Sequence, residues 1–178
     1  MDLNIKDQFD FTNIDYVVPD VVIKELSDQL ESITNGYVVG HVEPYDGPIE
    51  SYPINGFAAI SAALAPDKEY NIQDSLGKTG YDVHKFEFYI TSTQLPNYQF
   101  RVLFFEYGIG GYPVKIVLEE GIAYEINTKD SGYTFIIGDR VHLEDTINKI
   151  MSSKRVIKII QELINASLIA KRQKEESE

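Results

Sequence analysis

The residues best suited to acid–base or metal chemistry are His41 and Glu43, with Asp46 close behind them. Residues two apart on a β-strand project from the same face, so this imidazole and this carboxylate would lie side by side. A zinc site takes three or four protein ligands, and the other two histidines, His84 and His142, stand alone. We therefore predict no metal site, no cofactor and no catalytic residue.

The segment from Tyr107 to Pro113 places Gly-x-Gly-Gly directly after a predicted strand. Such a loop holds phosphate when a helix N-terminus follows it, but here Pro113 leads into another strand-like run. No Gly-Lys-Ser/Thr sequence occurs either. We predict a connection between strands that needs positive φ or close backbone approach. The alternative is a mobile loop in which Tyr107, Gly110 and Tyr112 touch a ligand or partner.

Nucleophilic catalysis has no support in the sequence. The chain has no cysteine, no Gly-x-Ser-x-Gly motif and no serine in an activating context. Neighbouring carboxylates such as Glu119-Glu120 and Glu144-Asp145 are expected by chance among 28 acidic residues. A nuclease core, with Asp followed by Glu-x-Lys at a strand end, is also missing. We therefore predict that the protein is not an enzyme.

The N-terminal part predicts a loose lead-in followed by one helix. Residues 1–15 show no regular apolar period. From Pro19 to Thr34, apolar residues recur at the spacing of one helical stripe. That stripe consists of Val22, Leu26, Leu30 and Ile33. Glu25, Asp28 and Glu31 lie on the opposite side, so we expect an acidic ridge on the outer face of this helix.

The middle of the chain predicts strands. Five stretches show either the β-branched and aromatic composition or the period of two that strands have: residues 37–42, 83–93, 100–107, 114–118 and 133–137. Leu95-Pro96-Asn97 predicts the turn of a hairpin, and the apolar run after it predicts a central strand. Residues 49–80 and 119–127 follow no clear pattern.

The C-terminal part predicts two helices. Asp139 can cap the first, whose apolar face consists of Leu143, Ile147, Ile150 and Met151. Ser152-Ser153 caps the second, which carries the clearest helical stripe in the chain. That stripe consists of Val156, Ile157, Ile160, Leu163, Ile164 and Leu168. The polar run 171–178 is expected to fray into solvent.

These elements predict a single globular α+β domain covering residues 1–178. We expect an antiparallel or mixed sheet of four to six strands, with the N-terminal helix and the two C-terminal helices packed on it. A chain of 178 residues with 43% hydrophobic residues suits one domain with a real core. No internal repeat or linker divides it.

The charge excludes several classes of partner. The net charge is −12, which argues against direct binding of nucleic acid or of anionic lipid. The absence of cysteine fits a reducing compartment. The first residues resemble neither a signal peptide nor a membrane span, so we expect a cytoplasmic protein.

The acidic residues are concentrated at the front of the chain. Residues 1–50 hold eleven Asp and Glu against two lysines, and the whole chain holds 12 tyrosines, which suit interfaces. We therefore predict a surface that binds a basic protein, such as a toxin domain. Its candidate residues are Glu25, Asp28, Glu31, Glu43, Asp46, Tyr107, Gly110 and Tyr112. The sequence carries no signal for an oligomeric state.

Three functional classes follow from these features. The first is a non-catalytic cytosolic protein-binding domain, an immunity-type inhibitor that neutralises a basic toxin or nuclease. Bacterial immunity proteins are of this physical type, and the analogy rests on charge, size and missing catalytic groups. The second is a small enzyme or ligand-binding domain that uses the Gly108–Gly111 loop with His41 or Glu43. The third is an accessory protein that mimics the charge of DNA.

Overall fold

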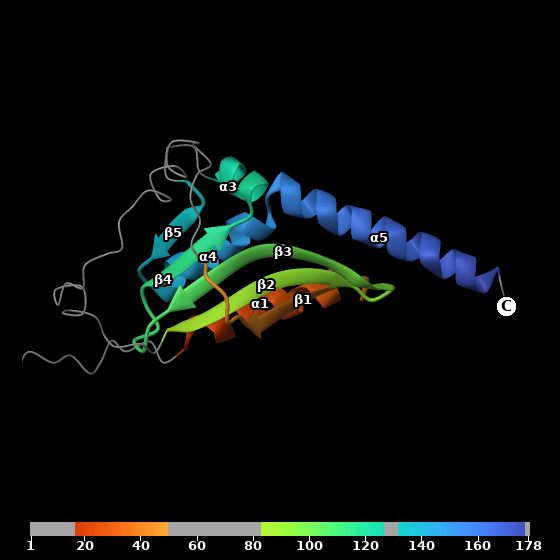
Figure 1. The fold of residues 1–178 in the computed structure, drawn as a ribbon. Helices are drawn as coiled ribbons and strands as arrows, with labels where there is room; N and C mark the ends of the chain where they lie inside the picture. Colours follow the sequence, from red (N-terminus) through yellow and green to blue (C-terminus); the bar gives the residue numbers. More distant parts are fainter. Residues whose placement is uncertain (1–16, 50–82, 127–131, 177–178) are drawn as a thin grey trace, which may run out of the picture.

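Each strand of the sheet pairs with the next strand along the chain. The computed structural model describes residues 17–49, 83–126 and 132–176. Within them, an antiparallel sheet has the order β1-β2-β3-β4-β5. Its strands are β1 (Val38–Pro44), β2 (His84–Ser92), β3 (Leu95–Tyr107), β4 (Val114–Leu118) and β5 (Thr134–Ile137). Figure 1 shows this sheet as a twisted meander.

The helices complete an α+β fold, as the sequence predicts. They are α1 (Pro19–Ile33), α3 (Glu120–Ile126), α4 (Arg140–Met151) and α5 (Lys154–Glu175). Helix α1 packs on β1 and on α4, and α5 packs on the first three strands and on α3 and α4. Figure 1 shows α1 along β1 and the long α5 crossing toward the far end of the β2–β3 hairpin.

The covered face of the sheet is set by the alternation of β2. Phe88, Ile90 and Ser92 are buried there. The hydroxyl groups of Ser92 and Ser167 of α5 are hydrogen-bonded at 2.5 Å. Gly40 of β1 pairs with Ile90 and therefore belongs to the same face, where α1 packs. The helices at both ends of the chain thus cover one face of the sheet and leave β2 residues of the other parity on the opposite face.

Helix α1 approaches β1 closely because Gly40 has no side chain. A Cβ atom at this position would lie 2.9 Å from Ser27 Cβ and 3.0 Å from the Ser27 carbonyl oxygen. At the end of the helix, Thr34 Oγ1 donates to the Leu30 carbonyl at 2.7 Å and accepts from the Val38 N–H at 3.0 Å. The turn and the close approach together fix how α1 lies on the strand.

Two side chains hold the start of helix α5. The Ser153 side chain caps it by accepting from the Val156 N–H, as the sequence predicts. In addition, the Glu125 carboxylate of α3 accepts from the N–H groups of Lys154 and Arg155 at 2.7 and 2.8 Å. A carboxylate at this end also suits the helix dipole. Helix α3 therefore anchors the start of α5.

The structure also corrects details of the sequence prediction. The hairpin turn lies at residues 93–94, and β3 already begins at Leu95, so the turn predicted at Leu95-Pro96-Asn97 is wrong. The unassigned stretch 119–127 contains α3. The lead-in 1–15 and residues 50–80 of the other unassigned stretch lie outside the described residues.

The buried stripe of α5 differs from the predicted one. Ile159 and Ser167 are buried, whereas Ile157 and Leu168 are exposed. Ser167 faces the sheet, where its hydroxyl group is hydrogen-bonded to that of Ser92. The polar run expected to fray is helical as far as Glu175, with exposed side chains.

We predict that Gly40→Ala destabilises the protein by about 1–3 kcal/mol, because the new methyl group overlaps Ser27 backbone and side chain. The free energy of unfolding in urea measures this. The matched control is Gly138→Ala, where an added Cβ meets no atom within 4 Å. Equal effects of the two substitutions would contradict the close approach of α1 to β1.

Candidate functional site

A row of polar side chains crosses the face of the sheet that the helices leave open. In the strand register, His41 pairs with Tyr89, and Tyr89 pairs with Arg101. One step along, Glu43 pairs with Glu87. Since the helix-covered residues have the other parity, these side chains project from the open face. The sequence prediction placed His41 and Glu43 on one face, and the structure has them there.

Tyr89 connects the row. Its ring stacks on the His41 imidazole with centroids 4.8 Å apart, and it forms a side-chain hydrogen bond with Glu43. His41 Nε2 lies 2.8 Å from Thr91 Oγ1. These residues border a hollow of about 600 Å³ on the open face. Its lining consists of Val39, His41, Tyr89, Thr91, Ser92, Thr93, Asn97 and Gln99.

The environment of Tyr89 favours its neutral form. Burial, followed by the hydrogen bond and negative charge of Glu43, raises the pKa of Tyr89 to about 12. The charge of Glu87 acts in the same direction, and Arg101 opposes it. At neutral pH this hydroxyl is therefore a hydrogen-bond donor and does not serve as a base.

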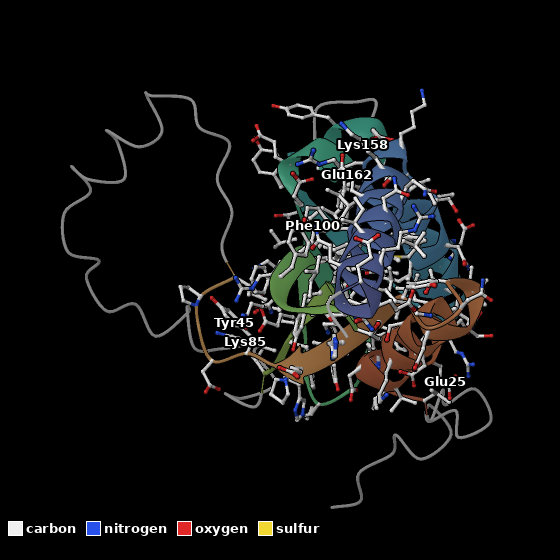
Figure 2. All side chains as sticks on the ribbon, turned by 90° about the vertical axis from the view of Figure 1, so that its right-hand side faces the viewer. Glu25, Tyr45, Lys85, Phe100, Lys158 and Glu162 are labelled. Carbon is white, nitrogen blue, oxygen red and sulfur yellow. The ribbon has the colours of Figure 1, made fainter. Side chains whose placement is uncertain are left out.

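Two ion pairs lie on the open face. Arg101 Nε donates to Glu87 Oε2 at 2.5 Å, and Lys115 Nζ donates to Glu106 Oε1 at 2.9 Å. Lys85 Nζ donates to the Gly47 carbonyl at 3.3 Å. Figure 2 shows Lys85 beside Tyr45, away from the helices. This face therefore carries two ion pairs, while Lys85 and Glu43 have no ion-pair partner among the described residues.

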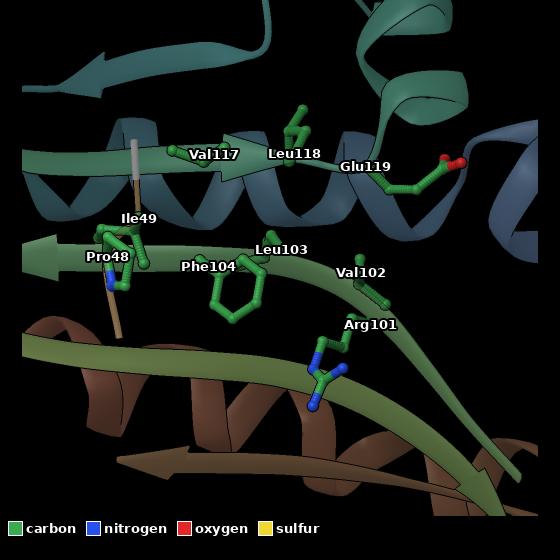
Figure 3. A pocket seen from close by; sticks show the side chains of 9 residues that line it. All are labelled: Pro48, Ile49, Arg101, Val102, Leu103, Phe104, Val117, Leu118 and Glu119. Atoms are coloured by element: carbon green, nitrogen blue, oxygen red, sulfur yellow. The ribbon is translucent and has the colours of Figure 1, made fainter. Parts of the chain in front are cut away.

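A second, smaller pocket of about 320 Å³ lies where Pro48 and Ile49 cross β3 and β4. Figure 3 shows its mostly apolar lining, with the Arg101 side chain directed toward β2 and the Glu119 side chain directed toward α5. Each of these groups has an ion-pair partner outside the pocket, Glu87 and Arg155 respectively. The pocket thus offers apolar surface and no unpaired catalytic group.

The glycine loop lies apart from this row. The Gly111 N–H donates to the Gly108 carbonyl at 2.9 Å, and Gly111 has a φ of +77°, as expected for a turn. An added Cβ on Gly111 would lie 3.6 Å from Pro19 Cδ. His41 and the loop lie about five β2 residues, or roughly 16 Å, apart. The structure therefore does not bring together the two parts of the predicted enzyme site.

The loop residues have unequal access to a partner. Tyr107 is 6% exposed, and its hydroxyl donates to Asp20 Oδ1 at 2.5 Å. Burial and this hydrogen bond raise the pKa of Tyr107. Gly110 is exposed and Tyr112 is half-buried. We therefore leave Tyr107 out of the candidate binding surface, because its ring and hydroxyl are used inside the fold.

The predicted acidic ridge is present on α1. Glu25, Asp28 and Glu31 are all exposed, and Figure 2 shows Glu25 on the side of the helix away from the sheet. Asp28 forms an ion pair with Lys24 at 2.8 Å. Glu25 and Glu31 have no ion-pair partner in the described part of the chain. Two acidic residues therefore remain uncompensated on this helix.

The end of β1 and the turn after it carry two more carboxylates, and Glu43 projects from the face of the sheet opposite α1. Glu43 and Asp46 are both exposed. Glu43 is hydrogen-bonded to Tyr89, whereas Asp46 has no ion-pair partner among the residues that the structure describes. Residues 17–49 together hold six carboxylates and a single lysine. We call the exposed side chains of Glu25, Asp28, Glu31, Glu43 and Asp46 the acidic border.

From residue 83 to residue 162, every described carboxylate has a partner. Glu125 and Asp139 accept from backbone N–H groups, Glu120 accepts from the Tyr133 hydroxyl, and the others form ion pairs: Glu87, Glu106, Glu119, Glu144, Asp145 and Glu162. Glu175 and Glu176, at the end of α5, have no ion-pair partner among the described residues. Within the described residues, the exposed carboxylates that have no such partner therefore lie on α1, in the turn after β1 and at the C-terminal end of α5.

Several further comparisons bear on the site. Within residues 17–49, 83–126 and 132–176, no group of three or more His, Cys, Asp or Glu side chains could hold a metal ion. No helix among these residues is long and apolar enough to cross a membrane. Comparison of the chain with protein-family models, curated proteins and solved structures finds no match.

Sequence reasoning missed Tyr89 and Arg101 as members of the polar row. The alternation of residues 83–93 already indicates that Glu87 and Tyr89 share a face. The sequence alternation does not reveal the strand register, which places His41 opposite Tyr89 and Tyr89 opposite Arg101.

We predict that Glu43→Gln lowers the pKa of Tyr89 from about 12 but leaves it above the ordinary value of 10.0, because burial still acts. Neutral Tyr89 contributes stability below pH 10 that is lost as the pH rises toward about 12. NMR titration of ring-labelled tyrosine measures this shift. Tyr107, which is bonded to Asp20, is the internal control; an unchanged Tyr89 titration would contradict the contact with Glu43.

Proposed function

We propose that this protein is a non-catalytic, cytosolic protein-binding domain that recognises a basic partner through the acidic border. The observation that carries the proposal is the distribution of unpaired carboxylates. Glu25, Glu31 and Asp46 lack ion-pair partners among the described residues, whereas carboxylates from residue 83 to residue 162 are satisfied. The exposed negative charge of Glu25 and Glu31 on α1 would steer a complementary partner and set its orientation.

The rest of α1 suits a protein interface. Val21 and Ile33 are exposed on the same helix as Glu25 and Glu31. Apolar side chains supply buried area in a complex, and charges around them give selectivity. A basic toxin or nuclease domain is the partner chemistry we propose, so the protein would act as an immunity-type inhibitor.

The two other classes have less support from the geometry. A DNA mimic needs carboxylates spread over much of one surface, and those of the sheet are paired with Arg101 and Lys115. A small enzyme needs the glycine loop beside His41, and these lie roughly 16 Å apart. The hollow beside His41 would suit a ligand, and His41→Ala with ligand screening would test that.

We predict that the double variant Glu25→Lys/Glu31→Lys loses most of its capture of a basic protein from a lysate of the source cells. The introduced lysines repel a basic partner, whereas the original glutamates attract it. The measurement is quantitative pull-down at increasing salt, because binding driven by exposed charge weakens as screening increases. Inhibition of the captured protein's own activity shows whether the complex is functional.

The matched control is Glu162→Lys/Glu175→Lys, which changes the net charge equally on exposed positions of α5. It should retain capture. Equal losses in the two variants would show that only the total charge matters, and undiminished capture by the α1 variant would refute the proposed surface. Adding Asp46→Lys tests whether the interface reaches the end of β1.

A further inference from the structure

The two outer strands of the sheet, β1 and β5, differ in whether a helix covers their edge. At β1, the Val38 N–H points away from β2, and it donates to Thr34 Oγ1 at 3.0 Å. Gly40, which also has its backbone groups directed outward, is buried beneath α1. Helix α1 therefore covers the first half of this outer strand, which is one way in which proteins protect a sheet edge.

Strand β5 has no such cover among the described residues. The Leu118 N–H donates to the Tyr133 carbonyl at 2.9 Å, and in this register Phe135 pairs with Ile116. In an antiparallel ladder, hydrogen-bonded positions alternate, so residues 133, 135 and 137 face β4. The N–H and C=O groups of Thr134 and Ile136 therefore point to the outside of the sheet.

The side chains at this edge are those of an unprotected strand. The sequence from Tyr133 to Gly138 contains no charge and no proline, the residues that normally prevent edge-to-edge pairing. Ile136 is 65% exposed. Two other strongly exposed apolar side chains flank the strand: Tyr124, at 70%, contacts Tyr133, and Val141, at 73%, lies in the first turn of α4.

The charges around β5 favour a second copy of this chain as the partner of the strand edge. Lys115 and Arg140, near β5, form ion pairs with Glu106 and Glu144, and the Asp139 carboxylate accepts hydrogen bonds from the His142 backbone N–H and ring. An approaching copy of this acidic chain would therefore meet little repulsion here, in contrast to the acidic border on α1 and β1. Because the edge is uncharged, it also offers no opposite charge that could bind a charged peptide.

We propose that β5 pairs antiparallel with β5 of a second copy, joining the two sheets across a two-fold axis at Phe135. In this register Thr134 lies opposite Ile136 of the second copy, and the reverse pair is formed by symmetry. The outward groups of both strands then form a hydrogen-bonded ladder. Each copy keeps its acidic border free, so dimerisation does not depend on the proposed binding of a basic partner.

The test is sedimentation velocity of the full chain from micromolar to millimolar concentration. The wild-type protein should shift from monomer to dimer. Ile136→Lys should weaken the dimer about tenfold or more, because the apolar contact of Ile136 is lost and the two new lysines lie diagonally across the strand pair from each other. The matched control Ile33→Lys, at an equally exposed position on α1, should leave the dimer unchanged.

Hydrogen–deuterium exchange of the wild-type protein tests the register directly and needs no variant. The amides of Thr134 and Ile136 should become protected at high concentration, while those of Phe135 and Ile137, already directed to β4, should change little. A protein that stays monomeric at millimolar concentration would overturn the proposal. So would a dimer that Ile136→Lys leaves intact or in which these two amides exchange as in the monomer.

Discussion

The pairing of β2 with β3 is the interaction on which the rest of the structure depends. This long hairpin lies within the meander, where it pairs with β1 on one side and β4 on the other and contacts α5. Its alternate side chains separate into two sets: Phe88 and Ile90 enter the core, while Glu87 and Tyr89 project to the opposite face. A change of register by one residue would exchange the two sets and would remove both the core and the polar row.

The helices build on this separation by covering only one face. Gly40 permits α1 to lie against β1, and Glu125 holds the start of α5 where its apolar side meets the sheet. On the other face, which has no such cover from the described helices, ion pairs join neighbouring strands, as in the pair of Arg101 and Glu87. The acidic side chains of α1 project away from the sheet and have no such neighbours.

The same architecture separates two surfaces with different physical character. The acidic border combines uncompensated carboxylates with exposed apolar groups on α1, which is suited to a basic protein. The β5 edge is uncharged, and its backbone groups at Thr134 and Ile136 are directed outward. Since the surfaces lie on opposite outer strands, a copy bound at one would not displace a partner at the other.

The sequence by itself determined the elements whose patterns are local. The caps Asp139 and Ser153 and the alternation of residues 83–93 depend on neighbours along the chain, and the α+β fold follows from the order of the elements. Of the stripe predicted for α1, Val22 and Leu30 are buried, whereas Ile33 is 73% exposed, so that part of the prediction is wrong. The exposure of Glu25, Asp28 and Glu31 also followed from helical spacing. The composition could not place the unpaired charge, because pairing depends on residues far apart in the chain.

Only the tertiary structure decided which side chains meet. The contact of His41 with Tyr89 depends on strand register, and the burial of Tyr107 depends on Asp20, 87 residues earlier in the chain. Ser167 is buried beside Ser92, although the helical period alone favoured Leu168. The physical reason is that periodicity specifies which face of an element is apolar, whereas register and packing specify what that face touches.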